Sequence, residues 1–493
     1  MLALIGNISG ALSTCCAGYS TAFVGTWTAL GALETDITTC CSAQQANFVS
    51  TWTIINSLSS ASSACGPVTV IHQSDIDPVN GYIIGNPGNY CLAEDIVSNA
   101  DIIISITASN VFLDMQNHEI LCSSANPISI LIYNVNNISI TNGTFTSGSS
   151  GILVNTVGNI TTERCVFQGQ QGGVGISGTS VSNHTIAYCI FRDNVSAITM
   201  DTSDSITIYD CVMCNSTAQQ VAMQTVSNLT IQNCIQGQSQ NTAIQVSNVL
   251  NMICNNCIIS GVTVTAGSAY LIVLTASSSI AIQSCLLSKA QSLQTGVGAA
   301  ISIQANVSNC TISDCYMYQN TIGVLRTGLS SEIVIDRCIV SQNVSGLSFG
   351  NSLPQNVTIQ NTLIVSMPQS PYIGIECGSL TRVYNCTLLN NGLSITAIAG
   401  AIRDVAIENC IFNRPLQLFN STINSIVRNN EAFSCGGTAF INTSTSNAFY
   451  NNNAFNAGSP AYSLSITNTF NVNTPDPLTG TAGDILSNLT NTN

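Results

Sequence analysis

The segment Ile231-Gln232-Asn233-Cys234-Ile235 carries the pattern that decides the fold. It consists of an aliphatic residue, two polar residues, a small residue that is usually cysteine, and another apolar residue. The pattern recurs along the chain with a step of 22 to 30 residues, most often 22 to 24. Its small position, called the slot below, is occupied by Gly143, Cys165, Cys189, Cys211, Cys234, Cys257, Cys285, Cys315, Cys338, Thr362, Cys386 and Cys410. A nearly constant step in this range is typical of stacked repeats.

The residues around each slot decide which kind of repeat this is. Apolar and polar residues alternate there, as in Val405, Ile407 and Ile411, and such alternation indicates strands with one buried face. Asparagine and glycine, which tolerate the left-handed conformation of tight corners, separate the strands. The leucine ladder of leucine-rich repeats and the 3.6-residue period of helical repeats are absent. We therefore expect coils of three short strands, stacked about 4.8 Å apart in a parallel β-helix.

Residues 80–430 resemble the right-handed parallel β-helix proteins of the pectate-lyase-like superfamily. Residues 110–120 look like the opening coil of such proteins. The resemblance implies an all-β, right-handed, single-stranded solenoid of about 12–15 coils. It also directs the search for function, because the superfamily includes lyases and hydrolases that cleave polysaccharides.

The segments outside the repeat have different patterns. Residues 1–60 keep a three-and-four spacing of apolar residues, which predicts an α-helical segment. Within it, Phe23 and Trp27 recur 25 residues later as Phe48 and Trp52, and we expect these four to drive assembly. Its many polar residues make membrane insertion the less favoured alternative. Residues 61–79 are expected to be a linker, and 431–493 an Asn/Ser/Thr-rich cap or extension.

The composition restricts the partners of the protein. Charged residues make up 6% of the chain, against about 25% in an average soluble protein. The net charge of −14 and the pI of about 4.2 exclude the basic surface that a nucleic-acid partner would require. A surface with so little charge repulsion favours self-association.

The 22 cysteines form two groups. Those in the slots are expected to point inward, either as free thiols packed as small apolar groups or as disulfides between neighbouring coils. Cysteines outside the slots are better disulfide candidates and would indicate an oxidising environment: Cys15, Cys16, Cys40, Cys41, Cys65, Cys91 and Cys122. The pairs Cys211/Cys214 and Cys254/Cys257 have zinc-like spacing, but the repeat explains them, so no metal site is predicted.

No catalytic signature of the β-helix enzymes is found. The densest acidic run, and the alternative site if the protein is an enzyme, consists of Asp193, Asp201, Asp204 and Asp210. Neither the acidic and His-Gly elements of polygalacturonases nor the Arg-x-Pro-x-x-Arg of pectate lyases is present, and the three histidines are scattered. The acids are therefore interpreted as solvated corner residues, and no cofactor is expected.

The sequence thus favours a non-enzymatic structural subunit of an extracellular fibre, appendage, cell surface or virion surface, which assembles with copies of itself. The alternatives are a β-helix spike that binds or cleaves polysaccharide, and an adhesin. All three place the protein outside the cell or on a particle surface.

Overall fold

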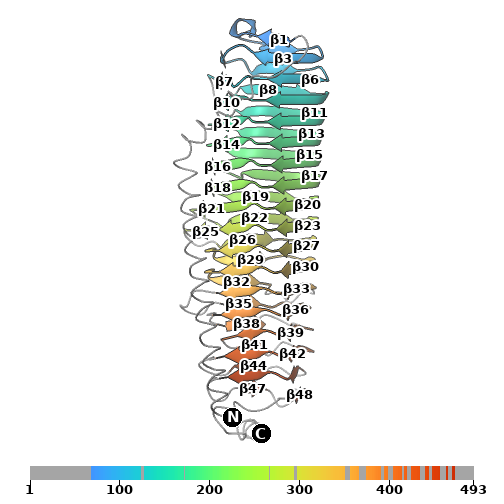
Figure 1. The fold of residues 1–493 in the computed structure, drawn as a ribbon, viewed down its shortest axis with the longest axis vertical. Helices are drawn as coiled ribbons and strands as arrows, with labels where there is room; N and C mark the ends of the chain where they lie inside the picture. The colour runs from blue at the N-terminus through green and yellow to red at the C-terminus, as the bar shows by residue number, and fades with distance from the viewer. Residues whose placement is uncertain are drawn as a thin grey trace, which may run out of the picture. The chain divides into compact units, whose positions relative to one another are not determined.

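The computed structural model describes residues 68–471, apart from 124–126, 171–172, 266, 294–296, 350–355, 366–372, 390–392, 398–402, 414–415, 419–423, 434–438, 443–446, 456–461 and 465–468. These residues form a right-handed parallel β-helix of about 15 coils, which confirms the predicted fold class (Figure 1). Two ladders of strands, a 31-stranded sheet and a second set of shorter strands, run along the stack. The apolar core lies between them.

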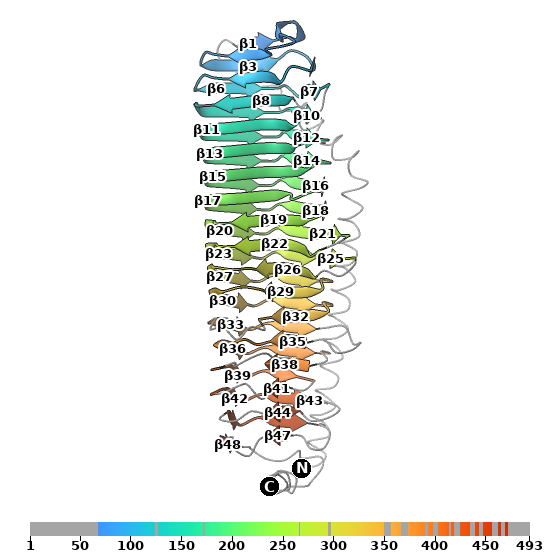
Figure 2. The same cartoon turned by 180° about the vertical axis from the view of Figure 1, so that it is seen from behind.

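One pair of coils shows how the chain turns. Strand β13 (Val174–Ala187) bends at Ser180 and Asn183, whose φ angles are positive, and so covers two faces of the coil. Strand β14 (Ile190–Arg192) covers the third face, and β15 (Ser196–Tyr209) begins the next coil in register with β13. The preceding coil contributes β11 (Ser150–Glu163) and β12 (Val166–Gln168). Where coils are longer, β21 (Ile258–Val264) and β25 (Gln291–Ser292) pair with each other outside the regular ladders (Figure 2).

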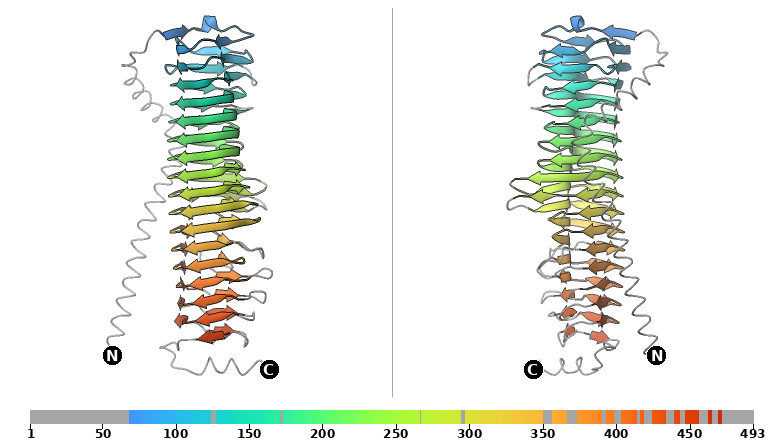
Figure 3. Two further views of the ribbon diagram at one scale, coloured as in Figure 1. Left: turned by 90° about the vertical axis from the view of Figure 1, so that its right-hand side faces the viewer. Right: turned by 60° about the vertical axis from the view of Figure 1, so that its left-hand side comes forward.

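The stack begins and ends outside the predicted limits of 80 and 430. Strand β1 (Val68–Ile71) pairs with β3 (Gly88–Leu92), so part of the predicted 61–79 linker is the first coil. The 3-10 helix η1 (Gln73–Asp75) follows it. Strand β48 (Thr469–Asn471) pairs with β45 (Ala448–Tyr450), so the C-terminal segment extends the ladder at least that far (Figure 3).

The predicted N-terminal helix and its assembly residues Phe23, Trp27, Phe48 and Trp52 lie outside the described residues. Self-association through this segment stays a prediction. In the part of the chain that the structure describes, no helix is long and apolar enough to cross a membrane.

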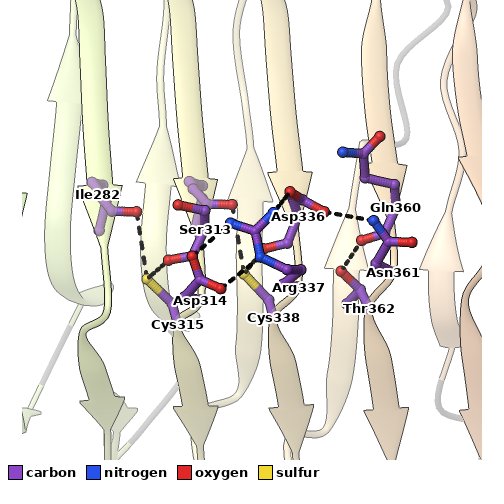
Figure 4. A network of polar contacts seen from close by, with 11 residues as sticks. Ile282, Ser313, Asp314, Cys315, Asp336, Arg337, Cys338, Gln360, Asn361 and Thr362 are labelled. Atoms are coloured by element: carbon purple, nitrogen blue, oxygen red, sulfur yellow. Dashed lines mark hydrogen bonds and ion pairs between the residues drawn. The ribbon is translucent and has the colours of Figure 1, made fainter.

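The slot marks a corner of the backbone as well as a position in the core. The residue before each slot has a positive φ: Asn142, Arg164, Tyr188, Asp210, Asn233, Asn256, Ser284, Asp314, Arg337, Asn361, Asn385 and Asn409. The slot side chain then turns back and donates to the carbonyl oxygen two residues earlier, as Cys315 Sγ does to Ser313 at 3.2 Å and Thr362 Oγ1 does to Gln360 at 2.8 Å (Figure 4). A small S–H or O–H group closes the corner, which explains why Cys and Thr share this position.

Gly143 is the exception in the slot, and its neighbour explains it. A Cβ atom at this position would lie 2.1 Å from Sδ of Met115 in the preceding coil. Met115 is fully buried and fills the space that a slot thiol occupies in other coils. The column of slot residues therefore begins with glycine, because the side chain of Met115 occupies the space that a slot side chain would need.

On the face formed by β12 and β14, three phenylalanines stack along the core. Phe145, Phe167 and Phe191 have ring centroids 4.8 Å apart and ring planes 7° apart in each successive pair. All three are buried. Gly175 makes room for the stack, since a Cβ there would approach Phe191 Cδ1 to 2.6 Å.

One inward position holds a charge. Arg326, on β29 (Ile322–Arg326), occupies the inward column between Ile303 and the coil of Phe349, and it is 4% exposed. Its Nε donates to Ser330 Oγ at 2.5 Å, but Nη1 and Nη2 have no hydrogen-bond partner among the described residues. Burial lowers the pKa of its guanidinium to about 10, because the core disfavours the charged form.

We expect Arg326→Met to stabilise the protein by about 1–4 kcal/mol. Methionine keeps the apolar length of the side chain and removes a buried charge with two unbonded nitrogens. Equilibrium urea unfolding measures the effect. Arg382→Met is the control, because Arg382 is exposed and loses the same charge; its stability should change by less than about 0.5 kcal/mol. Destabilisation by Arg326→Met would show that the guanidinium is accommodated at no cost.

Candidate functional site

Two shallow grooves lie on the outer surface of the long sheet. The first, called the asparagine groove, has a volume of about 500 Å³ and runs along the coils between Asn110 and Thr185. The second, the hydroxyl–amide groove, has a volume of about 320 Å³ and crosses four consecutive coils from Ser177 to Ser247. Both are open to solvent, and both are lined by side chains that the repeat places at equivalent positions.

A ladder of amides forms one wall of the asparagine groove. Asn110, Asn137, Asn159 and Asn183 have positive φ angles, which place their side chains at one corner of successive coils. The Nδ2 atoms of Asn137, Asn159 and Asn183 each donate to Oδ1 of the asparagine one coil earlier, at 2.9, 3.0 and 3.0 Å in turn. These bonds fix the orientation of every amide in the row.

The floor of the same groove is a row of hydroxyl groups. Ser139, Thr161 and Thr185 are aligned by the strand register, and Phe112 lies at the start of the row. The row continues beyond the groove as Thr207 and Thr230 and ends where Ile253 takes the position. Phe112 is half-buried, so it presents part of an aromatic surface beside the hydroxyls.

The hydroxyl–amide groove lies between two outward rows. Register aligns the first as Ser177, Thr199, Ala222 and Gln245, and the second as Thr179, Asp201, Gln224 and Ser247. Gln219 also lines the groove and donates its Nε2 proton to Oε1 of Gln245, in the first row, at 2.9 Å. Thr199 Oγ1 donates to Ser177 Oγ at 3.1 Å. The result is a polar surface that bears hydroxyls and amides from four coils and one carboxylate.

A family model described as a right-handed β-helix region matches residues 128–282 and 196–412, which together make up more than half of the chain. The chain belongs to the right-handed β-helix family. No curated protein matches its sequence. Solved structures with a similar fold include PfbA, a surface adhesin of Streptococcus pneumoniae, at 11% identity and a TM-score of 0.33, covering 64% of this chain and 93% of that one.

Two further β-helix structures illustrate the range of the fold. The tailspike protein of Escherichia coli bacteriophage HK620, solved with a pentasaccharide, is 12% identical over 78% of this chain and 72% of that one, with a TM-score of 0.35. The endo-xylogalacturonan hydrolase of Aspergillus tubingensis is 9% identical over 80% and 92%, with a TM-score of 0.23. At such values no residue role or ligand transfers to this β-helix protein.

The structure places three of the four acids of the alternative site in different surroundings. Asp201 lies in the hydroxyl–amide groove, and Asp204 accepts a hydrogen bond from Asn228 Nδ2 at 2.8 Å. Asp193 accepts one from Asn215 Nδ2 at 3.1 Å, at another corner. Among the described residues, no three of these acids bring their carboxylates within ligand distance of one another. Asp201 is the one carboxylate among the described residues that line the two grooves.

Acids elsewhere are held by corner partners. Arg337 binds Asp314 with both Nε and Nη2, each at 2.8 Å, and also contacts Asp336, as Figure 4 shows. Asn361 Nδ2 donates to Asp336 at 2.9 Å. The hydrogen bonds and charge of Arg337 lower the pKa of Asp314 below its usual value. These acids join neighbouring coils on the solvent side.

The structure places all ten slot cysteines in the core, each with an exposed fraction of 2% or less and each as a free thiol: Cys165, Cys189, Cys211, Cys234, Cys257, Cys285, Cys315, Cys338, Cys386 and Cys410. The disulfide prediction is wrong for Cys91 and Cys122, which are also free and buried. They lie on different sheets, since Cys91 pairs within the long sheet and Cys122 belongs to β7 (Glu119–Cys122) of the second ladder. The other five candidates, Cys15, Cys16, Cys40, Cys41 and Cys65, lie outside the described residues.

Sequence reasoning singled out Asp201 but missed the other residues of both grooves. One signal was available: the residue four positions before the slot is Ser139, Thr161, Thr185, Thr207 or Thr230 in five consecutive coils. This run predicts an outward row of hydroxyls. No comparable signal marks the two rows of the second groove, whose residue types vary from coil to coil.

Proposed function

We propose that this protein is a surface or extracellular β-helix that binds a polysaccharide along the hydroxyl–amide groove without cleaving it. The observation that carries the proposal is the alignment of hydroxyl and amide side chains from four consecutive coils in one open groove. A polysaccharide is a chain of sugar rings that bear hydroxyl groups at regular intervals, and hydroxyl and amide groups aligned across neighbouring coils can form hydrogen bonds with several of these rings. Hydroxyls and amides can each donate and accept hydrogen bonds.

The charge of the groove favours a neutral sugar chain. Asp201 is the one ionisable residue among those that line the groove. The groove therefore lacks the several charges of opposite sign that would attract a strongly acidic or a basic polymer. The strands beneath are held by long runs of parallel register, so the rows are rigid before a ligand arrives. Such preorganisation reduces the ordering cost of binding.

Affinity electrophoresis in gels that contain dextran, mannan or galactan tests the proposal with the full chain. We expect retardation by at least one of these polymers, and roughly a tenfold weaker interaction for the double variant Gln224→Ala/Gln245→Ala, because it removes two amides worth about 0.5–1.5 kcal/mol each. Gln232→Ala is the matched control, since Gln232 is exposed on the same strand, β17 (Val221–Gln232), outside the groove. Its retardation should equal that of the wild type.

Two results would overturn the proposal. One is the absence of retardation in every gel, or equal retardation of the double variant and the wild type. The other is release of reducing ends or unsaturated sugars that disappears in Asp201→Asn, which would make the groove a catalytic site.

A further inference from the structure

Three buried thiols converge at one point of the core. The Sγ atoms of Cys254, Cys257 and Cys285 all lie within 4.8 Å of one another, and those of Cys254 and Cys285 are 3.9 Å apart. The exposed fractions of the three residues are 0%, 1% and 2%. Among the described residues this is the single group of three or more His, Cys, Asp or Glu side chains with ligand atoms this close.

The repeat accounts for two of the sulfurs but not for the third. Cys257 and Cys285 occupy consecutive slots. Cys254 lies three residues before a slot, on β20 (Leu250–Asn255), in an inward column that reads Ile208, Ile231, Cys254, Ile282, Ile312 in register. Isoleucine is replaced by cysteine in one coil of this run, and that is the coil in which the new sulfur meets two slot sulfurs.

A pair with the same spacing shows that spacing alone does not produce the cluster. Cys214 follows the slot residue Cys211 by three positions instead of preceding it, and it lies on β16 (Val212–Ser216) of the second ladder. Cys211 and Cys214 belong to no group of three close ligands in the described part of the chain. Convergence therefore depends on the substitution in the isoleucine column.

We propose that Cys254, Cys257 and Cys285 together bind one Cu(I) ion. Thiolates are soft ligands, and they select soft ions such as Cu(I). With metal–sulfur bonds of about 2.3 Å, three sulfurs around a trigonal ion are separated by about 4.0 Å, close to the 3.9 Å between Cys254 and Cys285. Structural zinc instead takes four ligands, and no fourth His, Cys, Asp or Glu joins this group among the described residues.

Binding is a ligand exchange without a change of oxidation state. Copper–sulfur bonds form as the three thiol protons leave to water, so the copper remains Cu(I) and affinity rises with pH. Cys257 and Cys285 then give up the S–H bonds that they donate to the carbonyl oxygens of Asn255 and Gln283. Because the site is buried, the ion enters before the coil closes around it. The protein should therefore be loaded while it folds, during expression in copper-supplemented medium.

The test measures copper in the full chain after anaerobic purification, by elemental mass spectrometry. The wild type should carry one copper ion per chain, and Cys254→Ile, which restores the residue of the neighbouring coils, should carry none while folding normally. Two slot variants form a matched pair, because Thr362 shows that a slot accepts threonine. Cys285→Thr should lose the copper and Cys386→Thr, far along the same column, should keep it.

Several outcomes would overturn this assignment. Equal copper in the wild type and Cys254→Ile would mean that the extra sulfur is not a ligand. Equal loss in Cys285→Thr and Cys386→Thr would mean that the thiol column as a whole retains copper. Zinc in place of copper, after expression with both metals, would exclude the three-coordinate site. Circular dichroism spectra of the four proteins should superimpose, so that loss of metal is separated from loss of fold.

Discussion

Replacing His184 with isoleucine should make the protein markedly more resistant to acid. His184 is fully buried on β13, in an inward column between Ile160 and Ile206. Its Nε2 lies 3.1 Å from Thr162 Oγ1, and its Nδ1 has no hydrogen-bond partner among the residues that the structure describes. Burial lowers the pKa of the imidazole to about 3 from a usual 6.5, because the core cannot solvate the charged ring.

The sign of the effect follows from proton binding. Below pH 6.5 the unfolded chain takes up a proton at this residue, whereas the native state stays neutral down to about pH 3. The contribution of His184 to stability is therefore complete above pH 6.5 and is lost as the pH falls toward 3. The full loss amounts to about 5 kcal/mol, at about 1.36 kcal/mol for each pKa unit.

Urea unfolding at pH 7, 6, 5 and 4 measures this loss. The wild type should lose stability steadily between pH 6.5 and 4, and His184→Ile should follow a flatter curve, whatever its stability at pH 7. His72→Gln is the control, because His72 is exposed and its replacement should leave the slope unchanged. Parallel curves for the wild type and His184→Ile would show that the buried ring is not the acid-sensitive group.

The Phe167→Ala variant should lose about 3–5 kcal/mol of stability. The ring is buried between two parallel rings at 4.8 Å on each side, and the strands that carry them are fixed by ladders of backbone hydrogen bonds. The neighbouring rings cannot collapse into the space, so a cavity remains. The free energy of unfolding in guanidinium chloride at neutral pH is the measurement.

Phe112→Ala serves as the comparison for Phe167→Ala. Phe112 lies on the outer surface and is half-buried, so its truncation should cost less than about 1.5 kcal/mol. If both variants lost the same free energy, the stacked column would contribute no more than an ordinary surface contact.

The recurring slot made the fold predictable, because a backbone corner and a core position coincide in it. Cys234, Thr362 and Gly143 differ in chemistry but share a spacing, and the spacing set the architecture. For buried polar residues, residue type and position give opposite predictions. The register places His184 and Arg326 among isoleucines and other apolar side chains, so their columns predict burial, while their residue types suggest exposure. The position decided the outcome in both cases.

The grooves were less predictable than the fold, since they depend on differences between coils. Thr161 and Thr185 recur at one position and could have indicated a hydroxyl row. Gln224 and Gln245 belong to rows that no short sequence motif marks. The hydroxyl–amide groove forms between these rows, and its shape depends on the side chains of both. Cys254 was explained by the repeat at the level of sequence. Its closeness to Cys285 depends on which coils are adjacent, information that a three-residue spacing does not contain.

The uniform register has a consequence for how such a chain can change over generations. Successive coils meet through the same columns, so a duplicated or deleted coil of about 23 residues would find matching partners on both sides. The length of the β-helix then depends on the number of coils that the gene encodes, and each added coil lengthens it by one strand spacing of about 4.8 Å. Gain or loss of a gene segment that encodes one coil would change the length of the molecule, while the coils away from the junction keep their contacts.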